Sequence, residues 1–216
     1  MNDIQELRRV SSPAPKPQSI AWDGSALWIG SRQTRSIYRI NPASWTVEWE
    51  TIAPGVPWGM TAFGGELRVL CGETTEDHRI IRRCVPGQGF DPVFGLNCPD
   101  DTGSHLSFDG QNLNVSQWYP KKILALDQSG RIERTLHSPH GICGHTFVAP
   151  FFYLATTDQE DSTEYWLTRV DPRATPPIAV DLARIPFGAR GLAFDGRQFW
   201  SNHREQNQTV AFARPD

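Results

Sequence analysis

The feature that most constrains this chain is an internal repeat. Five segments each carry a short alternating run, a tight turn and a second alternating run. In three of them the turn is Asp-Gly, which adopts positive φ at low cost and therefore predicts a two-stranded hairpin. The aromatic anchors of the copies are 41, 45, 39 and 47 residues apart: Trp22, Phe63, Phe108, Phe147 and Phe194. A period of this length is typical of propellers and other repeat architectures.

Further runs complete each copy. A third apolar run follows every hairpin, and a fourth is visible in most copies, so each copy predicts four antiparallel strands. The sequence thus predicts an all-β fold, a single five-bladed β-propeller domain over residues 1–216. The blades are expected at residues 18–53, 57–95, 103–137, 141–184 and 188–216.

The last copy stops after its third strand, at Asp216. The N-terminal run over residues 4–10 is the candidate for the missing outer strand, and the Pro-rich residues 11–17 would cross from blade five to blade one. Such pairing would remove the exposed edge of an open ring. A disordered N-terminal tail is the alternative.

The copies share the pattern apolar-Ala-(Trp/Phe)-Asp-Gly-x-x-(Leu/Phe)-Trp-(Ile/Val), and Ile-x-x-Ile-Asn-Pro stands at residues 37–42. This pattern resembles the NHL-type propeller superfamily, which includes virginiamycin B lyase and the gluconolactonase-like propellers. Five blades and this length are similar to the plant-type glutaminyl cyclases, whose Phe-Thr-x-Gly-Leu motif is not found in any copy. The resemblance implies a ligand site at one mouth of the central channel. It transfers no catalytic residue, because a shared fold is weak support for a shared function.

Composition excludes several classes of function. Lys and Arg number 21 against 24 Asp and Glu, a net charge of -3, so no nucleic-acid partner is expected. No apolar run is long enough for a membrane span, and the N-terminus has no apolar signal segment, which predicts a cytoplasmic protein without membrane contact. The four cysteines are then expected as thiols. The chain has no phosphate-binding Gly-rich fingerprint, so no nucleotide cofactor is expected.

Extending the strand pairing outward from the aromatic anchors predicts a ring of small and polar residues at one mouth of the channel. The expected pairs are Gln18 with Ser31, Gly59 with Cys71, Ser104 with Gln117, Cys143 with Thr156, and Arg190 with His203. One step further inward lie Ile20, Thr61, Leu106, His145 and Leu192. A polar ring above an apolar shaft predicts a small-molecule site. The alternative is that water alone accounts for the polarity of the mouth.

Arg190 and His203 are the sharpest candidates in that ring. A guanidinium suits a carboxylate or phosphate, and a neighbouring imidazole can move a proton near neutral pH. Cys143, flanked by His140 and His145, is a third catalytic candidate. The structural alternative for Arg190 is an ion pair with Glu205. The structural alternative for Cys143 is an inert buried thiol. The expected substrate-binding residues are Gln18, Trp58, Ser104, His105, Gln117, Trp118 and Thr156.

The predicted function is acid–base catalysis, as a lyase, cyclase or isomerase, on an anionic small molecule. A non-catalytic propeller that binds a ligand or a protein is one alternative, and a metal-dependent hydrolase of the lactonase kind is another. No cofactor is expected, although a transition metal or calcium is possible. His105, Cys143 and His203 are the ligands expected for a transition metal. His145 has a structural alternative, as a core histidine.

Overall fold

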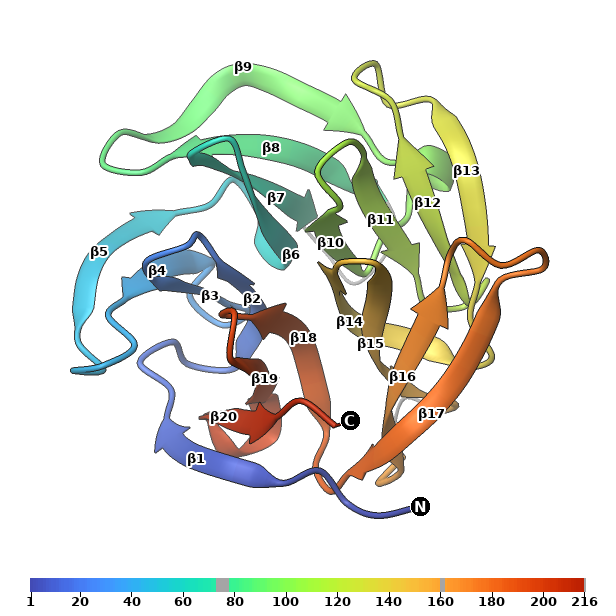
Figure 1. Ribbon diagram of the computed structural model, residues 1–216. Helices are drawn as coiled ribbons and strands as arrows, with labels where there is room; N and C mark the ends of the chain where they lie inside the picture. The colour runs from blue at the N-terminus through green and yellow to red at the C-terminus, as the bar shows by residue number, and fades with distance from the viewer. Residues whose placement is uncertain (73–77, 160–161, 216) are drawn as a thin grey trace.

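The chain folds into five four-stranded antiparallel sheets arranged radially around one axis, which confirms the predicted all-β, five-bladed propeller (Figure 1). The computed structural model describes residues 1–72, 78–159 and 162–215. Two short 3-10 segments, η1 (Pro99–Asp101) and η2 (Arg204–Gln206), are the helical parts of the described residues. No helix in those residues is long and apolar enough to cross a membrane.

The strands follow one another from the axis to the rim in each blade. Blade one contains β2 (Pro17–Trp22), β3 (Leu27–Ser31), β4 (Ser36–Ile40) and β5 (Val47–Ile52). Blade two contains β6 (Val56–Phe63), β7 (Glu66–Gly72), β8 (Ile80–Val85) and β9 (Gly89–Asn97). Blade three contains β10 (His105–Phe108), β11 (Leu113–Gln117), β12 (Lys122–Leu126) and β13 (Ile132–His137).

The last two blades repeat this order, and the N-terminal strand completes the ring. Blade four contains β14 (Gly141–Val148), β15 (Phe151–Thr157), β16 (Tyr165–Asp171) and β17 (Ile178–Ile185). Blade five contains β18 (Ala189–Phe194), β19 (Gln198–His203), β20 (Gln208–Ala213) and, outermost, β1 (Glu6–Ser11). The pairing of β1 with β20 confirms the predicted closure and covers an edge that would otherwise be open.

Tight turns join the two inner strands at one end of the channel, which we call the turn end. Gly24, Gly110 and Gly196 have φ between 94° and 97°, as the Asp-Gly signal requires. In blades one and five the aspartate of the turn also accepts a hydrogen bond of 2.7 Å from a tryptophan on the next strand, Asp23 from Trp28 and Asp195 from Trp200. The repeated residues therefore fix both the turn and the packing between neighbouring blades.

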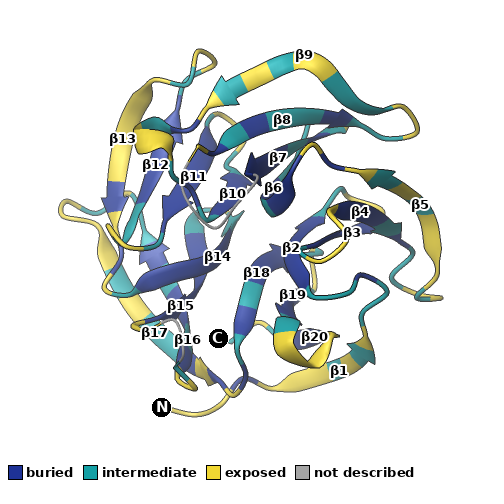
Figure 2. Ribbon diagram, turned by 180° about the vertical axis from the view of Figure 1, so that it is seen from behind, coloured by how far each residue is buried: buried dark blue, intermediate teal, exposed yellow. Residues whose placement is uncertain are grey.

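Burial decreases from the axis outward (Figure 2), because each inner strand lies between other blades while each outer strand faces solvent. At the axis the inner strands nearly touch. A Cβ atom on Gly59 would overlap the backbone of His105, and one on Gly144 would overlap the backbone of Gly191. The channel therefore narrows to a waist at this level. The imidazole of His105 lies in the waist, and its Nε2 is 3.2 Å from the position that a Cβ on Gly191 would occupy.

Near the turns of four blades, the inner hairpins have the predicted register. We call the opposite end of the channel the mouth end, and the register shifts toward it. Phe194 pairs with Phe199, Phe147 with Phe152, and His105 with Ser116. Four of the five innermost strands contain one extra residue, a β-bulge. The bulges lie at Gln18, Trp58, Cys143 and the pair Gly191–Leu192.

The predicted mouth pairs are wrong beyond these bulges. Ser31 pairs with Pro17, Cys71 with Pro57, and Thr156 with Ile142. In blade two the shift already begins at the turn, where Phe63 pairs with Glu66. In blade three Gln117 pairs with Lys122 on its other side, and Ser104 precedes the strand, donating its backbone N–H to the carbonyl of Ser116.

Candidate functional site

A hollow of about 480 Å³ lies at the mouth end, between blades four and five. We call it the mouth hollow. Arg190 and His203 both border it, although the predicted pairing between them is wrong. Because of the bulge at Gly191–Leu192, Arg190 pairs with Asn202 and His203 pairs with Ala189. Neighbours along a strand point to opposite faces, so the two side chains reach the hollow from different faces of the blade.

Arg190 is the second residue of β18, the innermost strand of blade five, and its guanidinium is held by neutral groups. Nη1 donates hydrogen bonds of 2.8 Å to the Tyr165 hydroxyl and 2.8 Å to the Ala189 carbonyl, and Cys143 Sγ is 3.8 Å away. Burial lowers the pKa of Arg190, but Cys143, Tyr165 and Glu205 raise it by more, so the side chain is a cation. Among the described carboxylates none forms an ion pair with it. The guanidinium is therefore oriented and charged, and its charge is available to an anion.

His203 ends β19 and is a neutral base in this setting. Its ring packs against Phe187, with the centroids 5.4 Å apart, and Nδ1 is 3.4 Å from Nη1 of Arg9. Burial and the charge of Arg9 lower the pKa of His203, and Glu205 opposes them with a smaller effect. The sequence analysis expected a neighbouring cation to have this effect. The cation is Arg9, on the strand that closes the ring, rather than Arg190.

Further guanidinium groups make this end of the channel positive. Arg204 donates a hydrogen bond of 2.8 Å to the side-chain oxygen of Gln18. Its pKa is lowered by burial and then by the charges of Arg190 and Arg32, which shows that these cations lie near one another. Glu205 offsets part of this charge. Hydrogen bonds from Lys16 and Arg204, both 3.0 Å, lower the pKa of Glu205 to about 2 and hold it as a carboxylate.

Two bulge residues, Trp58 (predicted as a substrate contact) and Cys143 (predicted as catalytic), lie beside guanidinium groups. Trp58 is half-buried between two guanidiniums, with Arg79 at 4.0 Å and Arg32 at 5.1 Å from its ring centroid. Cys143 is buried, and its sulfur lies beside Arg190. A bulge re-aims the side chain that it carries. The structure thus brings Cys143 to Arg190, and it places Trp58 within the group of cations that includes Arg32.

Four other predicted contacts are Ser104, Gln117, Trp118 and Thr156, and hydrogen bonds within the protein occupy the side chains of the three that are not aromatic. Gln117 is fully buried and donates to the carbonyls of Pro99 and Thr102. Thr156 is fully buried and shares a hydrogen bond of 2.9 Å with Thr168. The hydroxyl of Ser104 accepts the backbone N–H of Trp118. None of these four residues borders the mouth hollow.

The residues predicted to hold a metal are separated. His105 lies in the waist, Cys143 beside Arg190, and His203 beside Phe187 and Arg9. Within the described part of the chain no three His, Cys, Asp or Glu side chains are close enough to form a metal site. All four cysteines are free thiols, as expected. Burial raises the pKa of Cys71, Cys84 and Cys98 to about 12, which makes these three unreactive.

The sequence analysis missed Arg9, Tyr165 and Phe187. Arg9 and Phe187 lie outside the repeated pattern, before the first copy and between the last two. Tyr165 begins a third strand, where the copies show no shared polar residue. No repeat position marks any of them. The packing of blade four on blade five brings Tyr165 and Phe187 to the hollow, and the closure of the ring brings Arg9 to His203.

Comparison with solved structures finds several proteins to which this chain is similar. Myxococcus xanthus glutaminyl cyclase matches with a TM-score of 0.72 and 10% identity, over 100% of this chain and 99% of that one. A structural genomics protein of unknown function from Bacteroides thetaiotaomicron matches with a TM-score of 0.60 and 11% identity, over 99% of this chain and 72% of that one. Virginiamycin B lyase from Staphylococcus aureus matches with a TM-score of 0.49 and 12% identity, over 96% of this chain and 98% of that one.

At these identities, the two matches with TM-scores of 0.72 and 0.60 show a shared fold. They agree with the resemblance to propellers that the repeated pattern carries. No family model matches the chain, and no curated protein matches it. What the mouth hollow does must therefore be argued from its own residues.

Proposed function

We propose that this protein is a small-molecule enzyme that binds an anionic substrate in the mouth hollow and moves a proton on it. The observation that carries the proposal is that one hollow is bordered by Arg190, a cation without a carboxylate partner among the described residues, and by His203, a neutral imidazole. The first suits a carboxylate or phosphate, and the second can accept a proton at neutral pH.

The roles follow from the contacts of each group. Arg190 would hold the anionic end of the substrate, with Tyr165 and the carbonyl of Ala189 fixing the guanidinium plane. His203 would take a proton from the substrate, since burial and then the charge of Arg9 lower its pKa and favour the neutral imidazole. The Tyr165 hydroxyl accepts from Arg190, and its O–H group would donate a hydrogen bond to an oxyanion that develops on the substrate. Proton removal and return without a redox partner is the chemistry of lyases, cyclases and isomerases.

The experiment that tests this proposal is a conversion screen on small carboxylic acids. Hydroxy acids and amino acids would be incubated with the protein, and products identified by mass spectrometry. Glutamine belongs in the panel because a structure with this fold is a glutaminyl cyclase. For an acid that is converted, H203A should lower turnover by roughly 10²–10⁴-fold. H137A, which removes an exposed imidazole on β13, is the matched control and should leave turnover unchanged.

Two results would contradict the proposal. Full turnover in H203A would remove the imidazole from the mechanism. Acids that bind through Arg190 but are never converted would favour the non-catalytic binding propeller instead.

A further inference from the structure

A second hollow, of about 160 Å³, lies on the axis at the turn end, on the opposite side of the waist from the mouth hollow. We call it the turn-end hollow. The last residues of all five innermost strands line it, including Ile20, Thr61, Leu106, His145 and Leu192. These are the residues predicted to lie together in the shaft. A cavity of about 150 Å³ can hold a benzene-sized molecule, so this hollow suits a ligand of roughly six heavy atoms.

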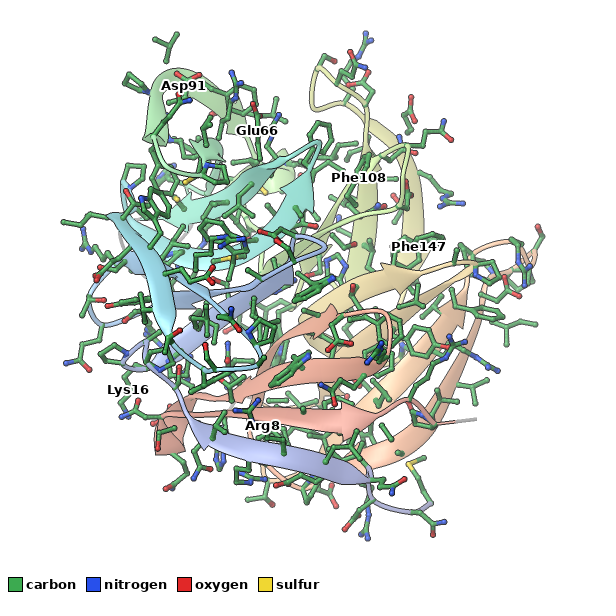
Figure 3. The ribbon with its side chains drawn as sticks, turned by 60° about the vertical axis from the view of Figure 1, so that its left-hand side comes forward. Arg8, Lys16, Glu66, Asp91, Phe108 and Phe147 are labelled. Atoms are coloured by element: carbon green, nitrogen blue, oxygen red, sulfur yellow. The ribbon has the colours of Figure 1, made fainter. Side chains whose placement is uncertain are left out.

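Aromatic rings surround the opening of this hollow. The five aromatic anchors of the repeat are all half-buried: Trp22, Phe63, Phe108, Phe147 and Phe194. Trp22, Phe108, Phe147 and Phe194 line the hollow directly, and Phe63 packs on Phe108 with the ring centroids 4.6 Å apart. We call these five residues the aromatic collar. Figure 3 shows two of them, Phe108 and Phe147, on neighbouring blades.

The floor of the hollow carries unpartnered hydrogen-bonding atoms. His145 is fully buried, and its Nε2 lies 3.3 Å from the carbonyl oxygen of His105. A carbonyl can only accept, so Nε2 carries the proton and Nδ1 of the neutral ring is an acceptor. Nδ1 has no partner, and neither does the hydroxyl of Ser107, which is also buried and also lines the hollow. Buried polar atoms normally have partners, so these two call for a ligand or water.

The charges around the opening favour a cation. None of the described residues lining the hollow has a charged side chain. Asp23, Asp109 and Asp195 directly follow three of the collar residues. Burial raises the pKa of Asp23 and of Asp195, but hydrogen bonds lower it by more. Arg39 forms an ion pair of 3.6 Å with Asp23, whereas none of the described cations forms one with Asp109 or Asp195. The collar already attracts one cation of the protein, because Arg68 lies 4.5 Å from the ring centroid of Phe63. Aromatic faces attract ammonium and guanidinium groups in this way.

We propose that the turn-end hollow binds a small primary ammonium ion. Its N–H groups donate to Nδ1 of His145 and to the hydroxyl of Ser107, while the aromatic collar surrounds the charge and the attached carbon chain. This is a binding site distinct from the mouth hollow. The waist separates the two, so a ligand at one end does not touch the residues of the other.

The test is titration of isotopically labelled protein with n-butylammonium, followed by NMR. Tetramethylammonium has the charge without the N–H donors, and 1-butanol has a donor without the charge. We expect saturable one-to-one binding of n-butylammonium, shifts at the His145 ring nitrogens, and weaker binding of both comparison molecules. F147L should weaken n-butylammonium binding by roughly three- to tenfold, the effect of losing one aromatic face. F90L, which alters a half-buried ring on the outer strand β9, should leave it unchanged.

Three outcomes would overturn the proposal: no saturable binding of n-butylammonium, equal binding of 1-butanol, or equal weakening by F90L and F147L. S107A keeps the test independent of any instability in collar variants, because this change removes one acceptor and little volume. It should weaken n-butylammonium binding but not tetramethylammonium binding. None of these results depends on turnover in the mouth hollow, so the proposed enzyme activity can fail while this proposal stands.

Discussion

The two ends of the channel differ in charge and in how closely they follow the repeat. At the turn end five blades present the same kind of residue, an aromatic ring beside a tight turn, and the side chains that line the hollow are uncharged. At the mouth end the blades differ from one another, and Arg190 and Arg204 border the hollow with Arg32 near them. Repeated residues serve the packing that all blades share, whereas residues that break the repeat create a local chemical environment.

The waist is what keeps these two environments separate, and altering it should have the largest effect on the protein. In G144A the new methyl group would overlap the backbone of Gly191, which cannot move without opening the ring. We expect a loss of roughly 3 kcal/mol in the free energy of unfolding, measured by chemical denaturation.

G188A is the matched control for the waist. Its new methyl group would lie 3.8 Å from the Tyr165 hydroxyl, which is ordinary contact. Equal stability of G144A and G188A would show that the inner strands can separate at low cost, and the two ends could then communicate.

A smaller effect concerns the strand that closes the ring. In R9A the repulsion between the guanidinium and the His203 ring is lost, so the pKa of His203 should rise toward its ordinary value near 6.5. The neutral imidazole is the active form. As the pH is lowered, turnover of a converted acid should therefore begin to fall at a higher pH in R9A than in the unaltered protein. NMR titration of the His203 ring measures the pKa directly.

R8A provides the comparison for R9A. Arg8 lies on the same strand, but its guanidinium packs against Trp45 and donates to the carbonyl of Pro42. The pKa of His203 should not change in this variant. A shift of equal size in R8A and R9A would mean that disturbance of β1, rather than loss of the charge, is responsible.

The sequence predicts the turn end much better than the mouth end, for physical reasons. Asp-Gly turns and alternating apolar residues fix the hairpins, so Phe194 and Phe199 pair as expected. The closure by β1 also follows from the missing strand in the last copy. A β-bulge, however, needs only a small local change of backbone angles. The residue types at Gln18 and Cys143 do not predict the bulges found there.

One extra residue in a strand is enough to break the pairing of Arg190 with His203, although both side chains still border one hollow. Contacts between distant segments, such as Arg9 with His203, have no local signal at all. The candidate residues were therefore found, but their mutual geometry was not.

The central claim is that the mouth end takes anions and the turn end takes cations. The most direct measurement is an NMR titration of n-butyrate and n-butylammonium, which share a four-carbon chain and differ in charge, into the unaltered protein, R190A and F147L. R190A should weaken butyrate binding by about 10- to 100-fold and leave butylammonium unaffected, since a charge-assisted hydrogen bond is lost at one end only. F147L should do the reverse, weakening only butylammonium. If either substitution weakens both ligands equally, or if butyrate binds R190A as tightly as the unaltered protein, the assignment of opposite charges to the two ends is wrong.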